Sequence, residues 1–306
     1  ADYRGPRGGN TGDDFHTLWA LRRALSLLDF NSNLIEVTVE GLRTDDESGG
    51  TPDTWDGVDC GLYYGDQATR KYERIAIAQL KYSASDPDTK WTIARLTYSK
   101  NPRTGNSVIG QLAKSYGILQ EKHPDLSATG NMPVHLVSNQ PIDPNVLHLF
   151  SNVFNKDFQA SQPELKDMEL VRKACKLPEE VFLTFINALD FSECGHESRF
   201  ALEERVLKSI SELTENDARS AINNMMVFVN RKMLPEAKGE TITREKILVE
   251  MGVSDPAALF PCPASTKYVQ RMVPRAASKQ VVAEIVGGAQ RICLHGEGGA
   301  GKTTSL

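Results

Sequence analysis

The chain has 306 residues, more than a single hydrophobic core usually holds, so at least two domains are expected. Its composition, 40% hydrophobic and 25% charged, is typical of folded soluble proteins, and no stretch approaches the roughly 20 apolar residues that span a bilayer. The net charge of −5 excludes a protein coated in basic surface but leaves open a local basic groove for nucleic acid.

The first half of the chain carries alternating helix and strand signals. A helix is predicted to enter at Thr11-Gly12-Asp13, with apolar residues at helical spacing up to Asp29. Three β-type runs follow, rich in β-branched or aromatic residues and separated by turn residues: 34–40, 58–64 and 74–82. Two helical segments and a short buried strand complete an αβββαβ order: 91–98, 108–120 and 133–138.

The second half is expected to be mostly helical. From about residue 145 to 254 the β signals fade, and apolar residues recur at three- and four-residue steps in 179–188 and 203–213. The prolines of Phe260-Pro-Cys-Pro-Ala-Ser265 predict a linker, followed by a helix at 280–286 and a strand at 291–295. The predicted domains are therefore 1–145, 146–255 and 256–306.

Cysteine and histidine usage bears on the compartment and on metal binding. The five cysteines and six histidines are scattered, without the spacings of a disulfide framework or a zinc site. The amino-terminal residues lack the apolar segment of a secretory signal. We therefore expect a cytoplasmic protein in which carboxylates hold any metal ion.

The last residues match the phosphate-binding pattern GxxxxGK[ST] directly after the predicted strand at 291–295. In this motif glycines let backbone N–H groups face the phosphates, while Lys302 supplies a positive charge and Thr303 a hydroxyl for Mg²⁺. The predicted ATP-binding residues are Gly296, Gly298, Gly299, Gly301, Lys302, Thr303 and Thr304. Because the chain stops at Leu306, we expect the front piece of a larger nucleotide-binding protein, unable to hydrolyse ATP by itself.

A second constellation lies in the predicted strands of the first half. Gln79 and Lys81 alternate with Leu80, so their side chains project from one face, roughly 6.6 Å apart. If the neighbouring run lies beside them, the carboxylate of Asp59 and the amide oxygen of Gln79 can hold Mg²⁺. Lys81 would then orient or help deprotonate a water and offset the charge on a phosphate, which is metal-assisted hydrolysis of a phosphodiester.

A second carboxylate is expected beside this group. Glu40, at the end of the preceding strand, is the natural candidate, with Glu36 and Asp56 as alternatives. The predicted catalytic residues are therefore Asp59, Gln79, Lys81 and Glu40, and the predicted metal ligands Asp59, Gln79 and Glu40. A chance QxK in a strand, with Asp59 capping a turn, is the competing interpretation.

These residues carry a resemblance to a known family. Helix, strand, Asp59 on the second strand, QxK on the third, then helix and strand resembles the PD-(D/E)xK restriction-endonuclease-like fold, in its glutamine variant. More closely, four segments resemble the double-stranded-DNA endonuclease domain of bacterial CBASS effectors: Gly12-Asp-Asp-Phe-His-Thr-Leu-Trp-Ala-Leu21, Gly57-Val-Asp59, Gln79-Leu-Lys81 and Leu136-Val-Ser-Asn-Gln-Pro141. The match runs to about residue 230.

With a P-loop after this nuclease, the chain is similar to AVAST proteins, antiviral STAND NTPases with an amino-terminal nuclease. The resemblance implies a nuclease core at 1–145, a helical extension or connector at 146–255, and a linker with the start of a STAND NTPase at 256–306. It implies Mg²⁺-dependent cleavage of double-stranded DNA during phage infection. It also implies an ATP-bound homo-oligomer, taken as a tetramer, that assembles when a carboxy-terminal sensor recognises a phage protein.

One position departs from the family pattern. Related nucleases often carry a glutamate on the first helix beside the phenylalanine, and His16 stands there in this chain. Either Glu40 takes that role or the site works with fewer carboxylates. His16 and Trp19 are predicted to be core or supporting residues, and Cys60 is predicted to be buried packing.

Other basic residues and functions stay open at this point. Lys100, Arg103 and Lys114 flank the segment after the third strand, where side chains can meet a DNA backbone or simply lie in solvent. A catalytically degenerate module that binds DNA or mediates assembly is one rival function. An NTP-driven restriction or helicase-like enzyme is the other.

Overall fold

The structure is a computed structural model that describes residues 6–29, 32–48, 55, 57–66, 69, 71–100, 107–153, 159–195, 198–214, 217–254 and 259, with 283 and 287. The predicted P-loop from Gly296 to Thr304 lies outside the described residues. The same holds for Asp56, Arg103, the strand at 291–295 and, apart from residue 283, the helix at 280–286.

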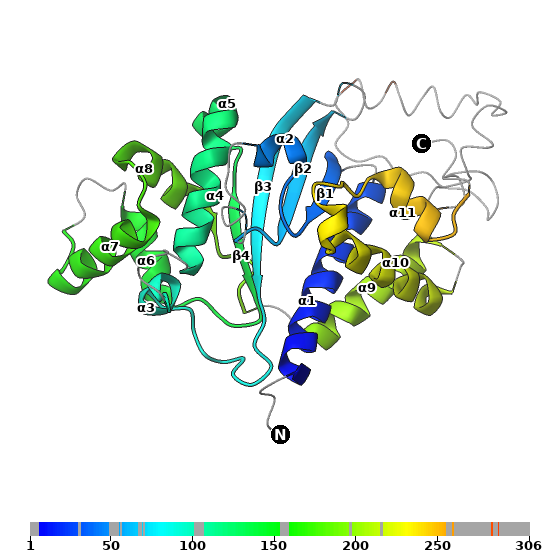
Figure 1. The fold of residues 1–306 in the computed structure, drawn as a ribbon, viewed down its shortest axis with the longest axis horizontal. Helices are drawn as coiled ribbons and strands as arrows, with labels where there is room; N and C mark the ends of the chain where they lie inside the picture. Colours follow the sequence, from blue (N-terminus) through cyan, green and yellow to red (C-terminus); the bar gives the residue numbers. More distant parts are fainter. Residues whose placement is uncertain are drawn as a thin grey trace.

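A five-stranded mixed sheet forms the centre of the molecule, in the order β1-β2-β3-β4-β5 (Figure 1). Strands β1 (Leu34–Val39), β2 (Cys60–Asp66) and β3 (Lys71–Lys81) are antiparallel neighbours. Strand β4 (Val134–Ser138) runs parallel to β3, and the two-residue β5 (Leu189–Asp190) runs parallel to β4. The four predicted strands are thus confirmed to within a few residues, whereas β5 was not predicted.

Helices cover both faces of the sheet (Figure 1). On one face lie α1 (Pro6–Leu25), the 3-10 turn η1 (Ser26–Leu28), α9 (Arg199–Leu213), α10 (Ala218–Lys232) and α11 (Arg244–Glu250). On the other lie α3 (Ile93–Thr97), α4 (Val108–Lys122), α5 (Pro124–Ala128), α6 (Pro144–Asn152), α7 (Gln162–Cys175) and α8 (Glu179–Ala188). The chain is therefore a mixed α/β protein, and the helices of residues 146–255 share both cores with the first 145 residues.

Strand β3 shows why the sheet is covered twice. Ala76, Ala78 and Leu80 pack in the core that contains α1, whereas Ile75 and Ile77 pack in the core that contains α4. Successive side chains of a strand point to opposite faces, so a continuous apolar run requires a helical layer on each side. No helix in the described part of the chain combines the length and apolar character needed to cross a membrane.

Helix α1 begins earlier than the sequence indicated. The entry predicted at Thr11-Gly12-Asp13 is wrong, because the helix already starts at Pro6. Proline is tolerated in the first helical turn, where its missing N–H would have no partner inside the helix. The predicted apolar residues of this helix are buried as expected: Phe15, Leu18, Leu21 and Leu25.

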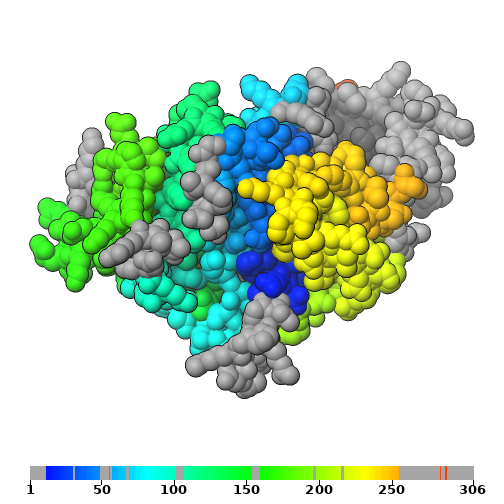
Figure 2. Space-filling model, in the orientation of Figure 1, coloured from blue at the N-terminus to red at the C-terminus, as the bar shows by residue number. Residues whose placement is uncertain are grey.

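The outer edge of β1 is closed by the segment between α10 and α11. Val37 exchanges two backbone hydrogen bonds with Ile242, of 3.0 and 2.7 Å. Lys238 in the same segment forms a 2.9 Å ion pair with Glu47 of the short helix α2 (Thr44–Glu47). Figure 2 shows the yellow surface of this segment directly against the blue surface that follows β1. A paired edge is protected from pairing with other chains, and the loop after β1 is held from both sides.

Candidate functional site

Two of the predicted site residues, Glu40 and Asp59, meet at the end of the antiparallel strands. The last register pairs of the antiparallel strands are Val39↔Cys60 and Cys60↔Ala78. Beyond these pairs, Glu40 N donates to Asp59 O at 2.8 Å, and Asp59 N donates to Ala78 O at 2.9 Å. These bonds hold Glu40 beside Asp59 and tie Asp59 to β3 directly before Gln79.

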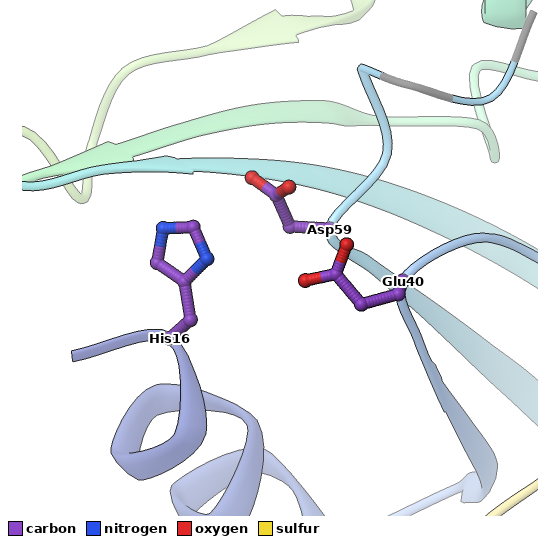
Figure 3. Close-up of side chains that lie close together, drawn as sticks. All are labelled: His16, Glu40 and Asp59. Carbon is purple, nitrogen blue, oxygen red and sulfur yellow. The ribbon is translucent and has the colours of Figure 1, made fainter. Parts of the chain in front are cut away.

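The imidazole of His16 completes a group with Glu40 and Asp59. One ligand atom from each of His16, Glu40 and Asp59 lies within 4.8 Å of the other two. Figure 3 shows the ring reaching from α1 toward the two carboxylates, which come from the loops after β1 and before β2. The Asp59 carboxylate is buried and accepts a hydrogen bond from Leu80 N, so its position is fixed against β3.

The electrostatics of the group reflect two carboxylates held together. Burial and the charge of Asp59 raise the pKa of Glu40 from 4.5 to about 7, although the charge of Lys81 opposes this. Glu40 as a residue is exposed, but its carboxyl group faces Asp59 and His16. Burial lowers the pKa of His16, which the attraction of Asp59 opposes and the charge of Lys81 reinforces. Lys81 therefore acts on the same group of side chains.

Glu40 is held in an unusual backbone conformation. Its φ of 53° is left-handed, and Gly41 follows with φ 126°. A side chain other than hydrogen makes the left-handed region unfavourable by roughly 1–2 kcal/mol, so the surroundings must enforce it. Thr38 Oγ1 donates to Gly41 O at 2.8 Å and accepts from Gly61 N at 3.1 Å. Side chains rarely adopt the φ of Gly41, and a Cβ there would displace Glu47 Oε1, so this position favours glycine beside Glu40.

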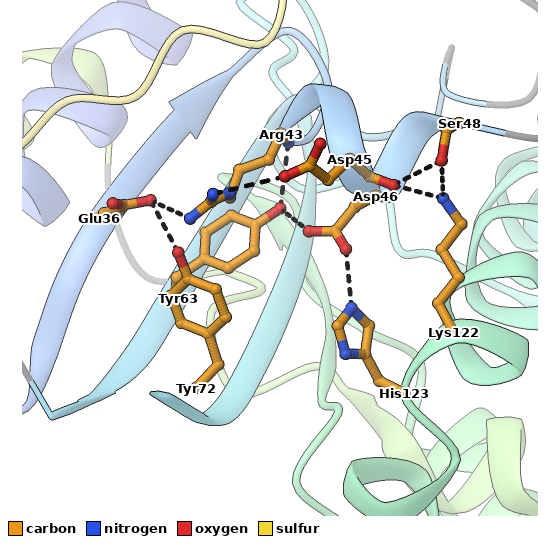
Figure 4. A network of polar contacts seen from close by, with 9 residues as sticks. All are labelled: Glu36, Arg43, Asp45, Asp46, Ser48, Tyr63, Tyr72, Lys122 and His123. Atoms are coloured by element: carbon orange, nitrogen blue, oxygen red, sulfur yellow. Dashed lines mark hydrogen bonds and ion pairs between the residues drawn. The ribbon is translucent and has the colours of Figure 1, made fainter. Parts of the chain in front are cut away.

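A polar network anchors the segment that follows Glu40 (Figure 4). Asp46 accepts hydrogen bonds from buried Tyr63 at 2.9 Å and pairs with His123 at 2.7 Å. Burial raises the pKa of Asp46, but these two partners outweigh it and the pKa is lowered overall. Arg43 binds Glu36 at 2.8 Å. The network ties α2 to strand β2 and helix α4, which fixes the loop that carries Glu40.

Gln79 lies on the face of β3 that α4 covers. It is fully buried, and its Nε2 donates to Gln111 Oε1 on α4 at 3.4 Å. Its Oε1 is buried without a hydrogen-bond partner among the described residues. An unpartnered buried oxygen costs free energy, and a cation is one partner that removes this cost. Glu40 and Asp59 carry mutually repelling carboxylates, and with His16 they form a group that could hold a divalent ion.

The structure places two further sequence candidates. His16, expected to be a core or supporting residue, lies outside the core, half-buried with its ring facing Asp59 and Glu40. Its place on the first helix, where nucleases of the resembled family carry glutamate, is the sequence signal that pointed to this position. Glu36, the alternative second carboxylate, is instead engaged by Arg43 and by the hydroxyl of Tyr72 at 3.2 Å. It is therefore part of the supporting network.

Several supporting predictions agree with the structure. Trp19 and Cys60 are buried in the core on the α1 side. Lys100 and Lys114 are exposed, so their contact with DNA stays a prediction. No protein-family model matches the chain, and no curated protein matches it either. The chemistry of the site therefore rests on its own residues.

Proposed function

We propose that this chain is a metal-dependent nuclease with a PD-(D/E)xK fold that cleaves double-stranded DNA. The observation that carries the proposal is the convergence of His16, Glu40 and Asp59 under the charge of Lys81. Carboxylates, an amide oxygen and an adjacent lysine are the groups that phosphodiester hydrolysis with a divalent ion needs. The helix before β1 and the antiparallel β1-β2-β3 meander with parallel β4 support the fold assignment.

The proposed ion is Mg²⁺, held by Glu40, Asp59 and the Oε1 of Gln79. Such an ion, when bound, polarises the phosphate and lowers the pKa of a bound water. His16 adds an imidazole nitrogen to the available ligands, and imidazole suits Mn²⁺ better than it suits Mg²⁺. We therefore expect both ions to support cleavage and Mn²⁺ to bind more tightly.

The remaining roles belong to side chains of the chain itself. Lys81 offsets the negative charge that grows on the phosphate during hydrolysis. His16 has a lowered pKa and is neutral at pH 7, so it keeps a lone pair for an ion or for a proton of the attacking water. The Asp59 carboxylate accepts a hydrogen bond from Leu80 N, which positions it as a ligand for the ion.

We further propose that the nuclease is an antiphage effector controlled by an ATP-binding STAND module. The support is the sequence motif from Gly296 to Thr304, which lies outside the described residues, together with the nuclease site in front of it. ATP is the proposed nucleotide, a phage protein the proposed trigger, a homo-tetramer the proposed assembly and the cytoplasm the proposed compartment.

Cleavage of supercoiled plasmid with Mg²⁺ or Mn²⁺ tests the nuclease proposal. Asp59→Asn should reduce the cleavage rate at least about a hundredfold, because it removes the best-fixed ligand. Asp66→Asn, the same change at the exposed far end of β2, is the matched control and should cleave like the wild type. Undiminished cleavage by Asp59→Asn would sink the proposal. A wild-type chain that binds DNA but never cuts it with either ion would favour the rival binding module.

A further inference from the structure

A cavity of about 360 Å³ lies between α1, α9 and the end of β4. Its charged lining consists of Arg22 and Arg23 of α1, Arg205 of α9 and Glu193, which follows β5. Three guanidinium groups and one carboxylate give this lining a formal charge of +2 at pH 7. We call this space the arginine cavity. An excess of guanidinium groups around a concave space is suited to an anionic ligand.

The single carboxylate of the cavity is already engaged. Glu193 Oε2 accepts a hydrogen bond from Trp19 Nε1 at 2.8 Å, and Glu193 Oε1 pairs with Arg23. The guanidinium of Arg23 also lies 4.8 Å from the centre of the Trp19 ring. Since Trp19 is buried and covered by Arg23, its ring offers no open face for stacking a base. The guanidinium groups of the cavity are suited to a phosphate group.

Arg23 has a further unmet requirement. Its Nε is buried and has no hydrogen-bond partner among the described residues. A buried donor without a partner costs free energy that an incoming oxygen acceptor would recover. Arginine presents its donors in a planar fork that matches the oxygens of a phosphate, so the unmet donor and the excess charge point to the same ligand.

The arginine cavity adjoins the candidate nuclease site. Ser138, which lines the cavity, is the register partner of Lys81 on the neighbouring strand. Phe15, also in the lining, precedes His16, and its ring lies 4.9 Å from that of Tyr82, the residue after Lys81. Two residues of the nuclease site therefore each neighbour a residue that lines the cavity. Phosphates recur along each DNA strand, roughly one per 3.4 Å of helix axis, so a strand bound at the nuclease site carries further phosphates past the adjoining cavity.

We propose that the arginine cavity binds a backbone phosphate of the DNA strand that is being cut. The His16, Glu40 and Asp59 group acts on the neighbouring phosphodiester of the same strand. This inference rests on the proposed nuclease function and adds a positioning subsite to it. The contact is with the backbone alone, so it fixes the register of the strand without reading its sequence.

The test measures duplex binding at a series of salt concentrations, with EDTA present so that the DNA stays intact. Arg205→Gln should weaken binding of a short DNA duplex about tenfold, the effect of one charge-assisted hydrogen bond. It should also reduce the slope of log K against log[salt] by about 0.9, the value for one phosphate contact. Arg22→Gln should do the same, which guards against a folding defect in either variant. Thermal unfolding checks that both are folded.

The matched control is Arg219→Gln on α10, which removes the same charge from an exposed arginine that pairs with Glu203 outside the cavity. This variant should keep the affinity and the salt slope of the wild type. Unchanged affinity and slope in both cavity variants would overturn the inference. Equal losses in the control variant would overturn it as well, because the effect would then be one of overall charge.

Calorimetry with inorganic phosphate and with deoxyadenosine monophosphate separates DNA from a free ligand. If inorganic phosphate or the mononucleotide binds in a way that depends on Arg205, while duplex binding does not, the cavity binds a free phosphate compound. That result would overturn the DNA proposal. Plasmid cleavage keeps the two proposals apart. If cleavage depends on Asp59 but the salt slope is unchanged in Arg22→Gln and Arg205→Gln, only the proposal for the arginine cavity is overturned. If the wild type never cleaves but Arg22→Gln and Arg205→Gln reduce the salt slope, the phosphate subsite is supported and the nuclease is overturned.

Discussion

Glu40 should lose a proton when the candidate site takes up a divalent ion near neutral pH. Its pKa is about 7 in the metal-free protein, so about half of the molecules carry the proton at pH 7. Only the ionised carboxylate binds a metal, so binding should release about 0.5 proton per ion at pH 7, about 0.9 at pH 6 and about 0.1 at pH 8. His16, with its lowered pKa, is neutral at pH 7 and adds little to this count.

Isothermal titration calorimetry with Mn²⁺ in buffers of different ionisation enthalpy measures this number directly. Glu40→Gln should abolish the pH-dependent release and weaken the ion's binding. Glu73→Gln, at an exposed position near the start of β3, is the matched control and should behave like the wild type. Proton release that does not change between pH 6 and pH 8, or that persists in Glu40→Gln, would refute the reasoning.

Three further predictions concern stability. Glu40→Gly should raise the free energy of unfolding of the metal-free protein by about 1 kcal/mol, measured in urea, because glycine accepts the left-handed backbone. The same variant should bind Mn²⁺ more weakly. A lower free energy of unfolding would contradict this. In metal-free protein, the raised pKa of Glu40 contributes stabilisation that is full below about pH 4.5 and is lost as the pH rises through about 7. Glu40→Gln removes this titration, so its melting temperature should change less between pH 5 and pH 8 than that of the wild type. Asp46→Asn should lower the free energy of unfolding by roughly 1–3 kcal/mol at pH 7 and by less at pH 3. The lowered pKa of Asp46 gives stabilisation that is lost on acidification. Equal losses at both pH values, measured by unfolding in urea, would exclude a charge effect.

The sequence was sufficient for elements whose pattern is local. Strand β3 contains the short apolar run 75–78 with β-branched residues, which predicted a strand, and the shared face of Gln79 and Lys81 follows from the alternation of side chains. Helix α8 was found from its apolar spacing with both bounds correct. Strand β5, with only Leu189 and Asp190, carries no pattern of its own, because it exists through its pairing with β4.

The candidate site was predictable in part for the same reason. Asp59 and Glu40 could be proposed because each stands at the end of a recognisable strand. The role of His16 could not be derived from spacing, since it depends on where α1 crosses the sheet. The left-handed backbone of Glu40 was equally hidden, because it is imposed by Thr38, Gly41 and Gly61, which come together only in the folded chain.

The most direct test of the central claim compares plasmid cleavage and ion binding in Lys81→Ala. The account predicts that the wild type cuts double-stranded DNA only with Mg²⁺ or Mn²⁺. Lys81→Ala should cut at least about a hundredfold more slowly while still binding Mn²⁺, because the lysine acts on the phosphate rather than on the ion. Lys71→Ala, at the exposed opposite end of β3, should cut like the wild type. Wild-type cleavage by Lys81→Ala would contradict the account.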